Sequence, residues 1–423
     1  MHKSIGKNIL CSILEWQVRR LRRKYQFKVV AVAGSLGKTS TKYAIAQLLS
    51  QNLRVRFQAG NYNDRATVPL VFFGEAQPAL FNIAGWLKVM WQAERQIASG
   101  YPFDVVVVEL GSDGPGQLAK FAYTKPDLAV VTAVAEEHME YFKQLDAVAE
   151  EELGIIDFSK QVLVNVDDTP AKYLEGRTFK SYGLDAQSAD YTVKKRDDRS
   201  LAGQAMTIAL PEGEVQIETP LVGLPGATAA LAAVATGDLL GLSKEELVKS
   251  MPQVLPYAGR MQILRGQQGS TLMDDTYNAA PRSFKAALDT LYVSSASQRI
   301  AILGSINEMG DLAEGMHREV GEYCDPTKLD LVVTVGDGAR RWLAPAAREK
   351  GCTVHEFLSP YEAGKFVLNN LQSGAVVLAK GSQNGVFTEE ALKQLLKDPA
   401  DVEKLVRQSA SWMKAKSRQF PNT

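Results

Sequence analysis

Short apolar runs alternate with longer stretches of helical periodicity along most of the chain. Four nearly continuous apolar runs lie in the first half, at residues 28–33, 104–110, 128–133 and 161–166. Each run has the length of one buried strand, and the segments between them are long enough for crossover helices. This alternation predicts a parallel α/β sheet that is covered by helices.

The pattern changes twice farther along. Between about residues 176 and 222 polar and apolar residues alternate, which predicts an antiparallel patch at the edge of the first domain, and an alanine-rich helix is expected at about 227–241. The stretch 252–259, which contains two prolines and a glycine, predicts a linker. Strand candidates then resume at residues 271–273, 299–303, 331–335 and 375–378. We therefore expect a second, nucleotide-binding-like α/β domain.

The N-terminal segment, residues 1–27, has a different pattern. Apolar residues recur at helical spacing, at Ile5, Ile9, Leu10, Ile13, Leu14, Trp16 and Leu21. Basic residues accompany them up to Lys28, with Glu15 as the one acidic residue, at Lys3, Lys7, Arg19, Arg20, Arg22, Arg23, Lys24 and Lys28. Such an amphipathic helix either packs on its own domain or lies on an anionic membrane surface through residues 1–24. It is too short and too charged to span a bilayer, and no signal-peptide cleavage site follows it.

The composition is that of an ordinary globular enzyme. A length of 423 residues favours more than one domain. Lys+Arg and Asp+Glu are equal at 48 each, so no net field attracts nucleic acid. The 3 cysteines lack metal-ligand spacing and fit a reducing compartment. We expect a cytoplasmic protein without a nucleic-acid partner.

A glycine turn follows the first predicted strand. Residues 31–44 read AVAGSLGKTSTKYA, and Val32 stands where the usual nucleotide-binding pattern has a glycine, so the loop is shortened. A turn of this kind points backbone N–H groups and a helix dipole at one spot, where anions bind. Lys38 is predicted to contact the terminal phosphates of a nucleotide, and the Thr39 hydroxyl is predicted to bind Mg²⁺. The alternative is a chance Gly-Lys-Thr in a loop.

Two polar side chains are expected at the tips of neighbouring strands. Glu109 ends the apolar run that begins at Asp104, and His138 follows the run that ends at Ala133. Because Mg²⁺ needs more oxygen ligands than a nucleotide and one hydroxyl supply, Glu109 is the predicted carboxylate ligand. The alternatives are a helix-capping role for Glu109 and a structural role for His138.

Together these residues resemble the Mur ligase family, ATP-dependent amide-bond-forming enzymes of peptidoglycan assembly to which folylpolyglutamate synthase is related. The resemblance covers about residues 28–415 and is strongest for the branch that adds D-alanyl-D-alanine to a UDP-linked muramoyl tripeptide. Besides the loop, it is carried by the segments Gly60-Asn61-Tyr62-Asn63, Val108-Glu109-Leu110-Gly111, Glu137-His138-Met139-Glu140, Gly259-Arg260-Met261-Gln262, Asp274-Asp275-Thr276-Tyr277-Asn278 and Lys380-Gly381-Ser382.

The resemblance implies a fold and a reaction. The fold is a central P-loop parallel-sheet ATPase domain at 28–258 and a C-terminal Rossmann-like α/β domain at 259–423. In the reaction, an acceptor carboxylate takes the γ-phosphoryl group of ATP to give an acyl phosphate, and an amine then displaces phosphate. The implied cofactors are ATP and Mg²⁺. The implied partners are a muropeptide or other peptide carboxylate and an amino acid or dipeptide.

The resemblance also implies roles for single residues. Catalytic roles fall on Lys38, Glu109, His138 and Arg260, and metal ligation falls on Thr39, Glu109 and His138. Nucleotide contacts fall on Gly34, Ser35, Gly37, Lys38, Thr39, Ser40, Arg260, Asp275 and Asn278.

Glu152 marks a departure from the family. In most relatives a lysine about fourteen residues after the histidine is carbamylated, and here Glu152 occupies that position. A glutamate carries the negative charge without carbon dioxide, so we predict that it replaces the carbamate as a catalytic residue. The alternative is a surface charge on an acidic helix.

Other departures concern substrates. Pro225, Gly226 and Ala229 replace polar residues near the adenine, and Ala280 and Ser305 replace an asparagine and an aspartate. Only about 27 residues precede the first strand, where relatives carry a uridine-binding domain. We expect that another chain recognises the glycan or that the acceptor is not a UDP-sugar, and a lipid-linked muropeptide would suit a peripheral position on the inner membrane face.

Two further functions stay open. One is a ligase of the same fold that extends another peptide or a polyglutamate-like chain, and the other is a non-catalytic ATP-binding subunit.

Overall fold

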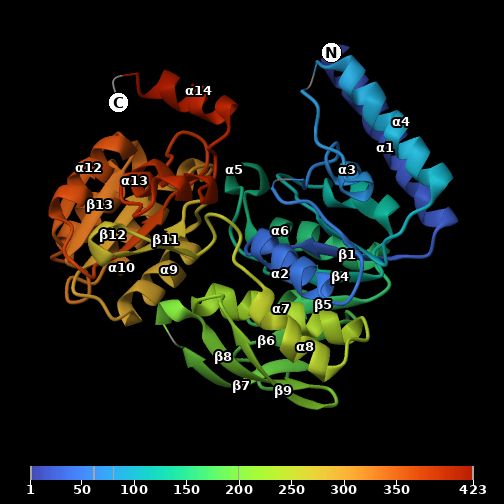
Figure 1. Cartoon of the computed structure of the whole chain (residues 1–423), viewed down its shortest axis with the longest axis horizontal. Helices are drawn as coiled ribbons and strands as arrows, with labels where there is room; N and C mark the ends of the chain where they lie inside the picture. Colours follow the sequence, from blue (N-terminus) through green and yellow to red (C-terminus); the bar gives the residue numbers. More distant parts are fainter. Residues whose placement is uncertain (1, 61, 80, 199, 422–423) are drawn as a thin grey trace. The chain divides into compact units, whose positions relative to one another are not determined.

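The computed structural model describes residues 2–60, 62–79, 81–198 and 200–421, and it divides into two compact units (Figure 1). Asn61, part of one family-like segment, lies outside the described residues. Unit 1 comprises Met1–Arg196, Met206–Thr219 and Thr228–Leu255, and unit 2 comprises Asp197–Ala205, Pro220–Ala227 and Pro256–Thr423. The domain bounds predicted from the sequence stay a proposal.

The first sheet has nine strands in the order β2-β3-β1-β4-β5-β6-β7-β8-β9. Their bounds are β1 (Lys28–Ala33), β2 (Val55–Arg56), β3 (Val105–Glu109), β4 (Leu128–Val131), β5 (Val162–Asn165), β6 (Lys180–Gly183), β7 (Tyr191–Asp198), β8 (Gln204–Leu210) and β9 (Gly213–Thr219). Pairing is parallel from β2 through β7. The four strands predicted in this half are confirmed, and β1, the P-loop strand, lies between β3 and β4.

The predicted antiparallel patch is only partly correct. β6 and β7 pair in parallel, with Tyr182 opposite Tyr191, and so extend the parallel sheet. β8 and β9 are neighbours joined by residues 211–212, a connection that only antiparallel strands allow. Alternation of polar and apolar residues reports that one face of a strand is covered, and it does not report the direction of the strand.

The helices that accompany this sheet are α1 (His2–Lys24), α2 (Lys38–Ser50), α3 (Val68–Phe73), α4 (Ile83–Ser99), α5 (Met139–Phe142), α6 (Leu145–Leu153), α7 (Gly223–Leu239) and α8 (Lys244–Ser250). The predicted N-terminal helix is confirmed. Leu14, Val18 and Leu21, spaced four and three residues apart, are fully buried, so one face of α1 packs on its own unit. No helix within the described ranges is long and apolar enough to cross a membrane.

Unit 2 contains a six-stranded sheet in the order β10-β11-β15-β12-β13-β14. Its strands are β10 (Gln262–Arg265), β11 (Thr271–Asp275), β12 (Arg299–Gly304), β13 (Leu331–Val335), β14 (Val354–Phe357) and β15 (Val376–Lys380), and its helices are α9 (Pro281–Val293), α10 (Ala313–Tyr323), α11 (Ala344–Glu349), α12 (Pro360–Asn370), α13 (Glu389–Lys393) and α14 (Ala410–Gln419). All pairs are parallel except β10 with β11. The four predicted strands are confirmed, whereas the edge strands β10 and β14 were missed because they are partly polar.

Buried charges fix the end of the chain to unit 2. Lys416 of α14 is 0% exposed, and its Nζ lies 2.9 Å from Glu389 Oε1 and 2.6 Å from Glu390 Oε1. Arg407 also pairs with Glu389, at 2.7 Å, and donates to the carbonyl oxygens of Thr276 and Tyr277. The loop after β11 is therefore anchored by the same charge network that holds α14.

Replacing Lys416 with alanine should destabilise unit 2 by about 3 kcal/mol, because Glu389 and Glu390 would stay buried with less compensation. The free energy of unfolding from denaturant titration measures this effect. Lys414→Ala removes an exposed lysine from the same helix and should cost well under 1 kcal/mol. An equal decrease in the free energy of unfolding for the two variants would contradict a stabilising role for the buried charges.

Candidate active site

The loop between β1 and α2 has a backbone that requires its two glycines. Gly34 has a φ of 120°, and a Cβ there would lie 2.4 Å from Thr132 Oγ1 and 2.8 Å from the Ala133 nitrogen. Gly37, with a φ of 81°, directly precedes α2. Both values lie in the region that favours glycine. The loop therefore folds tightly against the end of β4.

Ser35 tethers this loop. Its hydroxyl donates to the Ala133 carbonyl at 3.1 Å and accepts from the Ala135 N–H at 2.7 Å, and its own N–H donates to the Ala133 carbonyl. These bonds leave anion binding to the first turn of α2, whose N–H groups have no partner within the helix. A direct phosphate contact of Ser35 stays a prediction, as do those of Gly34, Gly37 and Ser40.

Lys38 lies among carboxylates. Its Nζ is 3.2 Å from Glu137 Oε2 and 3.2 Å from the Ser35 carbonyl oxygen. Burial on its own lowers the pKa of Lys38, but the charges of Glu137, Glu152 and Glu109 outweigh this effect and raise it. Lys38 is therefore a permanent cation in a largely buried position.

Glu109 and Thr39, two of the predicted metal ligands, lie together. Thr39 Oγ1 is 3.3 Å from Glu109 Oε1, and both side chains are buried. Glu109 Oε2 lies 3.2 Å from Nζ of Lys42, and Asn63 donates to Oε1 at 3.2 Å. A carboxylate and a hydroxyl are the hard oxygen donors that Mg²⁺ prefers, so this pair fits the ion. Lys42 already faces the carboxylate with positive charge, as the ion would.

His138 occupies a different part of the site. It adopts a left-handed backbone conformation with a φ of 51° at the start of α5. Its Nε2 lies 3.5 Å from Asp113 Oδ1 and 3.7 Å from Glu137 Oε1. Within the described ranges no three histidine, cysteine, aspartate or glutamate side chains form a group that could hold a metal. A shared metal site of His138 with Glu109 therefore stays a prediction.

Glu152 is buried behind the loop, so the alternative of a surface charge is wrong. It is 2% exposed, and its Oε2 accepts a hydrogen bond from the Gly34 N–H at 2.7 Å. Its neighbours in α6 differ, since Glu150 is exposed and Glu151 accepts from Ser112 Oγ at 2.7 Å. In this acidic run Glu150 is exposed to solvent, Glu151 accepts a structural hydrogen bond, and Glu152 contacts the loop between β1 and α2.

The environment of Glu152 perturbs its titration. Burial raises its pKa to about 7, against the opposing effect of the Lys38 charge and with a further contribution from Glu137. Glu137 bridges the two sides of the site because it contacts both Lys38 and His138.

Unit 2 places its predicted residues around the tip of β11. Asp275 accepts from the Met261 N–H at 3.1 Å and pairs with Nζ of Lys380 at 2.5 Å. Lys380 is 0% exposed and also donates to the Asn278 carbonyl at 3.1 Å, and burial lowers its pKa despite the Asp275 charge. Asp275 thus orders the loop, and nucleotide contacts by Asp275 and Asn278 stay predictions.

Arg260 presents a donor without a partner. Its guanidinium carbon lies 4.5 Å from the centre of the Tyr277 ring. The Nε atom is buried, and no hydrogen-bond acceptor for it is found within the described ranges. A buried N–H of this kind is costly, and an anion would relieve that cost.

Comparison with known proteins decides the family. Residues 32–237 match the Mur ligase middle domain, and residues 259–383 match the Mur ligase glutamate ligase domain. The chain belongs to the Mur ligase family.

Named relatives and solved structures of Mur ligases agree with this assignment. UDP-N-acetylmuramoyl-tripeptide–D-alanyl-D-alanine ligase of Bacillus subtilis is 29% identical over 381 residues, which cover 88% of this chain and 76% of the relative. The enzyme of that name from Escherichia coli is 27% identical over 324 residues, which cover 75% of this chain and 66% of the relative. MurF from Acinetobacter baumannii superposes with a TM-score of 0.76 at 23% identity, covering 93% and 81%. MurF from Thermotoga maritima in complex with ADP superposes with a TM-score of 0.73 at 21% identity, and the match covers 93% of this chain and 84% of that one. These structures confirm the predicted fold class.

Three residues of this Mur ligase that make close charge contacts were not predicted as site residues: Lys42 and Glu137 in unit 1, and Lys380 in unit 2, which was named only within a family-like segment. Lys42 follows Lys38 by one helical turn, which is a readable signal for a shared face. Lys380 ends the apolar run of β15 as Glu109 ends that of β3, and the same strand-tip argument would have found it. Glu137 had been noted only as a neighbour of His138.

Glu152→Gln should stabilise the nucleotide-free protein at pH 8 relative to wild type and have a much smaller effect at pH 5. A carboxyl group whose pKa is raised in the folded state contributes stability that is full below its unfolded pKa, near 4.5, and is lost as the pH rises through about 7. The difference in the free energy of unfolding between the variant and the wild type should grow by about 2 kcal/mol from pH 5 to pH 8. Denaturant titration at both pH values measures it.

Glu150→Gln, at the exposed neighbour, is the matched control and should show no such pH dependence. A Glu152→Gln effect that is the same at pH 5 and pH 8 would contradict the raised pKa.

Proposed function

We propose that this chain is an ATP-dependent carboxylate–amine ligase that adds D-alanyl-D-alanine to the peptide of a cell-wall muropeptide. The observation that carries the proposal is the phosphate loop with its cationic Lys38, in a chain matched by both Mur ligase domains. The substrate class follows the names of the Bacillus subtilis and Escherichia coli relatives.

ATP would supply the phosphoryl group that activates the acceptor carboxylate. The first-turn N–H groups of α2 would bind its phosphates, and Lys38 would face the terminal ones. Thr39 and Glu109, which lie 3.3 Å apart, would offer Mg²⁺ a hydroxyl and a carboxylate oxygen. Lys42 would hold Glu109 in place, since it is itself fixed by the Gly60 carbonyl at 3.1 Å. The chain thus contributes positioning and charge and needs no covalent nucleophile.

Glu152 would hold Lys38 and the loop in position relative to each other. Its carboxylate is bonded to the Gly34 N–H and interacts with the Lys38 charge, so it links the start of the loop to the start of α2. We propose that it fills the place of the carbamylated lysine of most relatives and that the enzyme requires no carbon dioxide. Binding of a cation and a nucleotide nearby would favour its charged form.

Arg260 would bind a phosphate through its buried Nε–H, for which no acceptor is found among the described residues. The ring of Tyr277 supports the guanidinium from one side and fixes its plane. His138, beside Glu137 and Asp113, would complete the catalytic set.

The proposed reaction is tested by phosphate release from ATP with a panel of acceptors, each supplied with D-alanyl-D-alanine or with glutamate as the amine. The panel holds a UDP-linked muramoyl tripeptide, a lipid-linked muropeptide and a folyl or polyglutamyl peptide. Acceptor-dependent release with a muropeptide is expected, and mass spectrometry of the product identifies the new amide. Release that needs only the polyglutamyl peptide would favour the other ligase, and ATP binding without acceptor-dependent release would favour a non-catalytic subunit.

Lys38→Ala should lower turnover about 10²- to 10³-fold, or roughly 3–4 kcal/mol of barrier, because it removes a preorganised charge from the terminal phosphates. The fold should survive, as judged by circular dichroism. The matched control is Lys365→Ala, at an exposed lysine of α12, with unchanged turnover. A Lys38→Ala enzyme with wild-type turnover would rule out this phosphate site.

Glu152→Gln should lower turnover, while wild-type turnover should be unchanged when bicarbonate is removed from the assay. Glu152→Lys should be active only with added bicarbonate, because a lysine there needs carbamylation to regain the negative charge. Full turnover of Glu152→Gln would refute the role of Glu152. Bicarbonate dependence of the wild-type enzyme would show that Glu152 does not replace the carbamate.

We further propose that the reaction takes place in the cytoplasm, with the enzyme peripheral on the inner membrane face. Residues 1–24 would make the contact, because α1 combines basic residues with an exposed tryptophan.

A further inference from the structure

Helices α1 and α4 of unit 1 lie side by side and run in the same direction (Figure 1). Gln17 donates to the Met90 carbonyl at 2.9 Å, and Lys24 donates to the Ile97 carbonyl at 2.7 Å, so residue numbers rise together along the pair. Leu14 and Trp86 are buried between the pair and the rest of unit 1. The opposite side of the pair carries a second set of apolar residues.

Each helix exposes the same row of side chains on that opposite side. The rows are Ile9, Ile13, Trp16 and Arg20 on α1, and Ile83, Leu87, Trp91 and Arg95 on α4. Within each row the members are three or four residues apart, so they form one stripe on the helix. Trp16 is 51% exposed and Trp91 is 58% exposed. We call the two rows together the α1–α4 surface.

The tryptophan and arginine of each row are in contact. The guanidinium carbon of Arg20 lies 4.4 Å from the centre of the Trp16 ring, and that of Arg95 lies 4.9 Å from the centre of the Trp91 ring. Both helices therefore present the same order from their N-terminal ends: two aliphatic side chains, an indole and a guanidinium.

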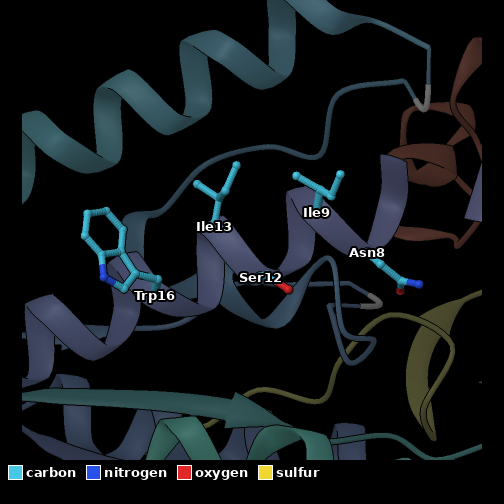
Figure 2. Close-up of a pocket in the computed structure, with 5 residues that line it drawn as sticks. All are labelled: Asn8, Ile9, Ser12, Ile13 and Trp16. Atoms are coloured by element: carbon cyan, nitrogen blue, oxygen red, sulfur yellow. The ribbon is translucent and has the colours of Figure 1, made fainter. Parts of the chain in front are cut away.

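The α1–α4 surface is hollowed at two places, one on α1 and one between α1 and α4. A first hollow of about 580 Å³ is lined by Asn8, Ile9, Ser12, Ile13 and Trp16, and Figure 2 shows these side chains along α1. A second hollow of about 400 Å³ is lined by Arg20, Arg23, Lys24, Glu94, Ile97 and Ala98. The first is apolar and the second is basic, and they follow each other along α1.

The basic hollow keeps positive charge available. Glu94, its one acidic residue, already accepts from Gln17 at 2.9 Å and from Arg20 at 2.6 Å. Lys24 is bound to carbonyl groups at the end of α4. Arg23 is exposed, and no hydrogen bond or ion pair of its side chain is found within the described ranges. Among the described residues no carboxylate pairs with Arg23 or Arg95, so both would attract an anionic surface.

The side chains that both rows expose are of the kinds that bind at a bilayer interface. Aliphatic side chains suit the acyl region, tryptophan prefers the headgroup boundary, and arginine binds lipid phosphates. A second copy of this chain fits less well, because it would bring the same arginines together without added acidic partners. An exposed apolar surface of this extent marks an interaction site.

We infer that the α1–α4 surface docks on an anionic lipid bilayer. Residues 1–24 supply only half of this surface, and α4 supplies the other half. The inference deepens the proposed membrane contact, on which it rests, and it does not depend on ligase activity. Docking through two parallel helices fixes the orientation of unit 1 on the membrane, which a single helix would not do.

The test uses the full chain and vesicle flotation. One set of vesicles contains phosphatidylglycerol and phosphatidylcholine, and the other contains phosphatidylcholine alone. The chain should float with the anionic vesicles, and raising the salt concentration should weaken this binding because the phosphate contacts are screened. The double variant Trp16→Ala/Trp91→Ala should lower the partition coefficient about tenfold or more, and Trp91→Ala alone should lower it about threefold.

Matched controls distinguish binding through this surface from nonspecific hydrophobic or electrostatic binding to vesicles. Val293→Ala/Leu358→Ala removes two exposed apolar side chains from unit 2 and should leave partitioning unchanged. Arg23→Glu/Arg95→Glu should abolish the preference for anionic vesicles, whereas Lys350→Glu/Lys365→Glu, with the same change of charge on unit 2, should change it much less. All replaced side chains are exposed, and circular dichroism checks the fold.

Three outcomes would overturn the inference. Equal binding to both kinds of vesicle would remove the role of anionic lipid, and an unaffected Trp91→Ala variant would remove α4. If the wild type forms a dimer and does not bind vesicles, and if the tryptophan variants are monomeric, the surface binds a second copy of the chain instead. Phosphate release with a water-soluble acceptor should be equal in all these variants, so loss of docking is distinguishable from failure of the ligase proposal.

Discussion

A carboxylate enclosed behind a phosphate loop is stable as an anion only where a cation and hydrogen-bond donors face it. Lys38 and the Gly34 N–H face Glu152 in this way, and the balance between burial and these partners sets its pKa to about 7. Gly34 permits the arrangement, since a side chain at its position would collide with Thr132. Charge therefore contributes to the order of this loop, and a bound nucleotide would redistribute that charge.

Both units place a buried ion pair at the carboxyl end of a parallel sheet. In unit 1, Glu109 at the tip of β3 faces Lys42. In unit 2, Lys380 at the tip of β15 faces Asp275 at the tip of β11. The strand ends of a parallel sheet are where ligands of α/β domains bind, and a fixed pair there costs little reorganisation when a charged ligand arrives.

Much of the fold was readable because its strands are short, apolar and separated by helical segments. The direction of β6 and β7 was not readable, since the pattern of polar and apolar residues does not show how a strand pairs with its neighbour. Edge strands β10 and β14 were missed because partial exposure leaves them polar. For the site, Lys38, Thr39 and Glu109 lie where motif and strand-tip arguments put them. The burial of Glu152 could not be derived, because three consecutive glutamates look alike in a sequence and differ only in the direction each faces on α6.

The anchoring of α14 has a practical consequence for how the protein is handled. Arg407 donates directly to the backbone of the loop after β11, although it lies far from it in the sequence, and both Arg407 and Lys416 pair with Glu389. Trimming the chain upstream of Lys416, for instance to obtain a shorter crystallisation variant, would leave Glu389 and Glu390 buried with fewer cationic partners. Fusion partners and affinity tags are better appended after Gln419 than substituted for the final helix.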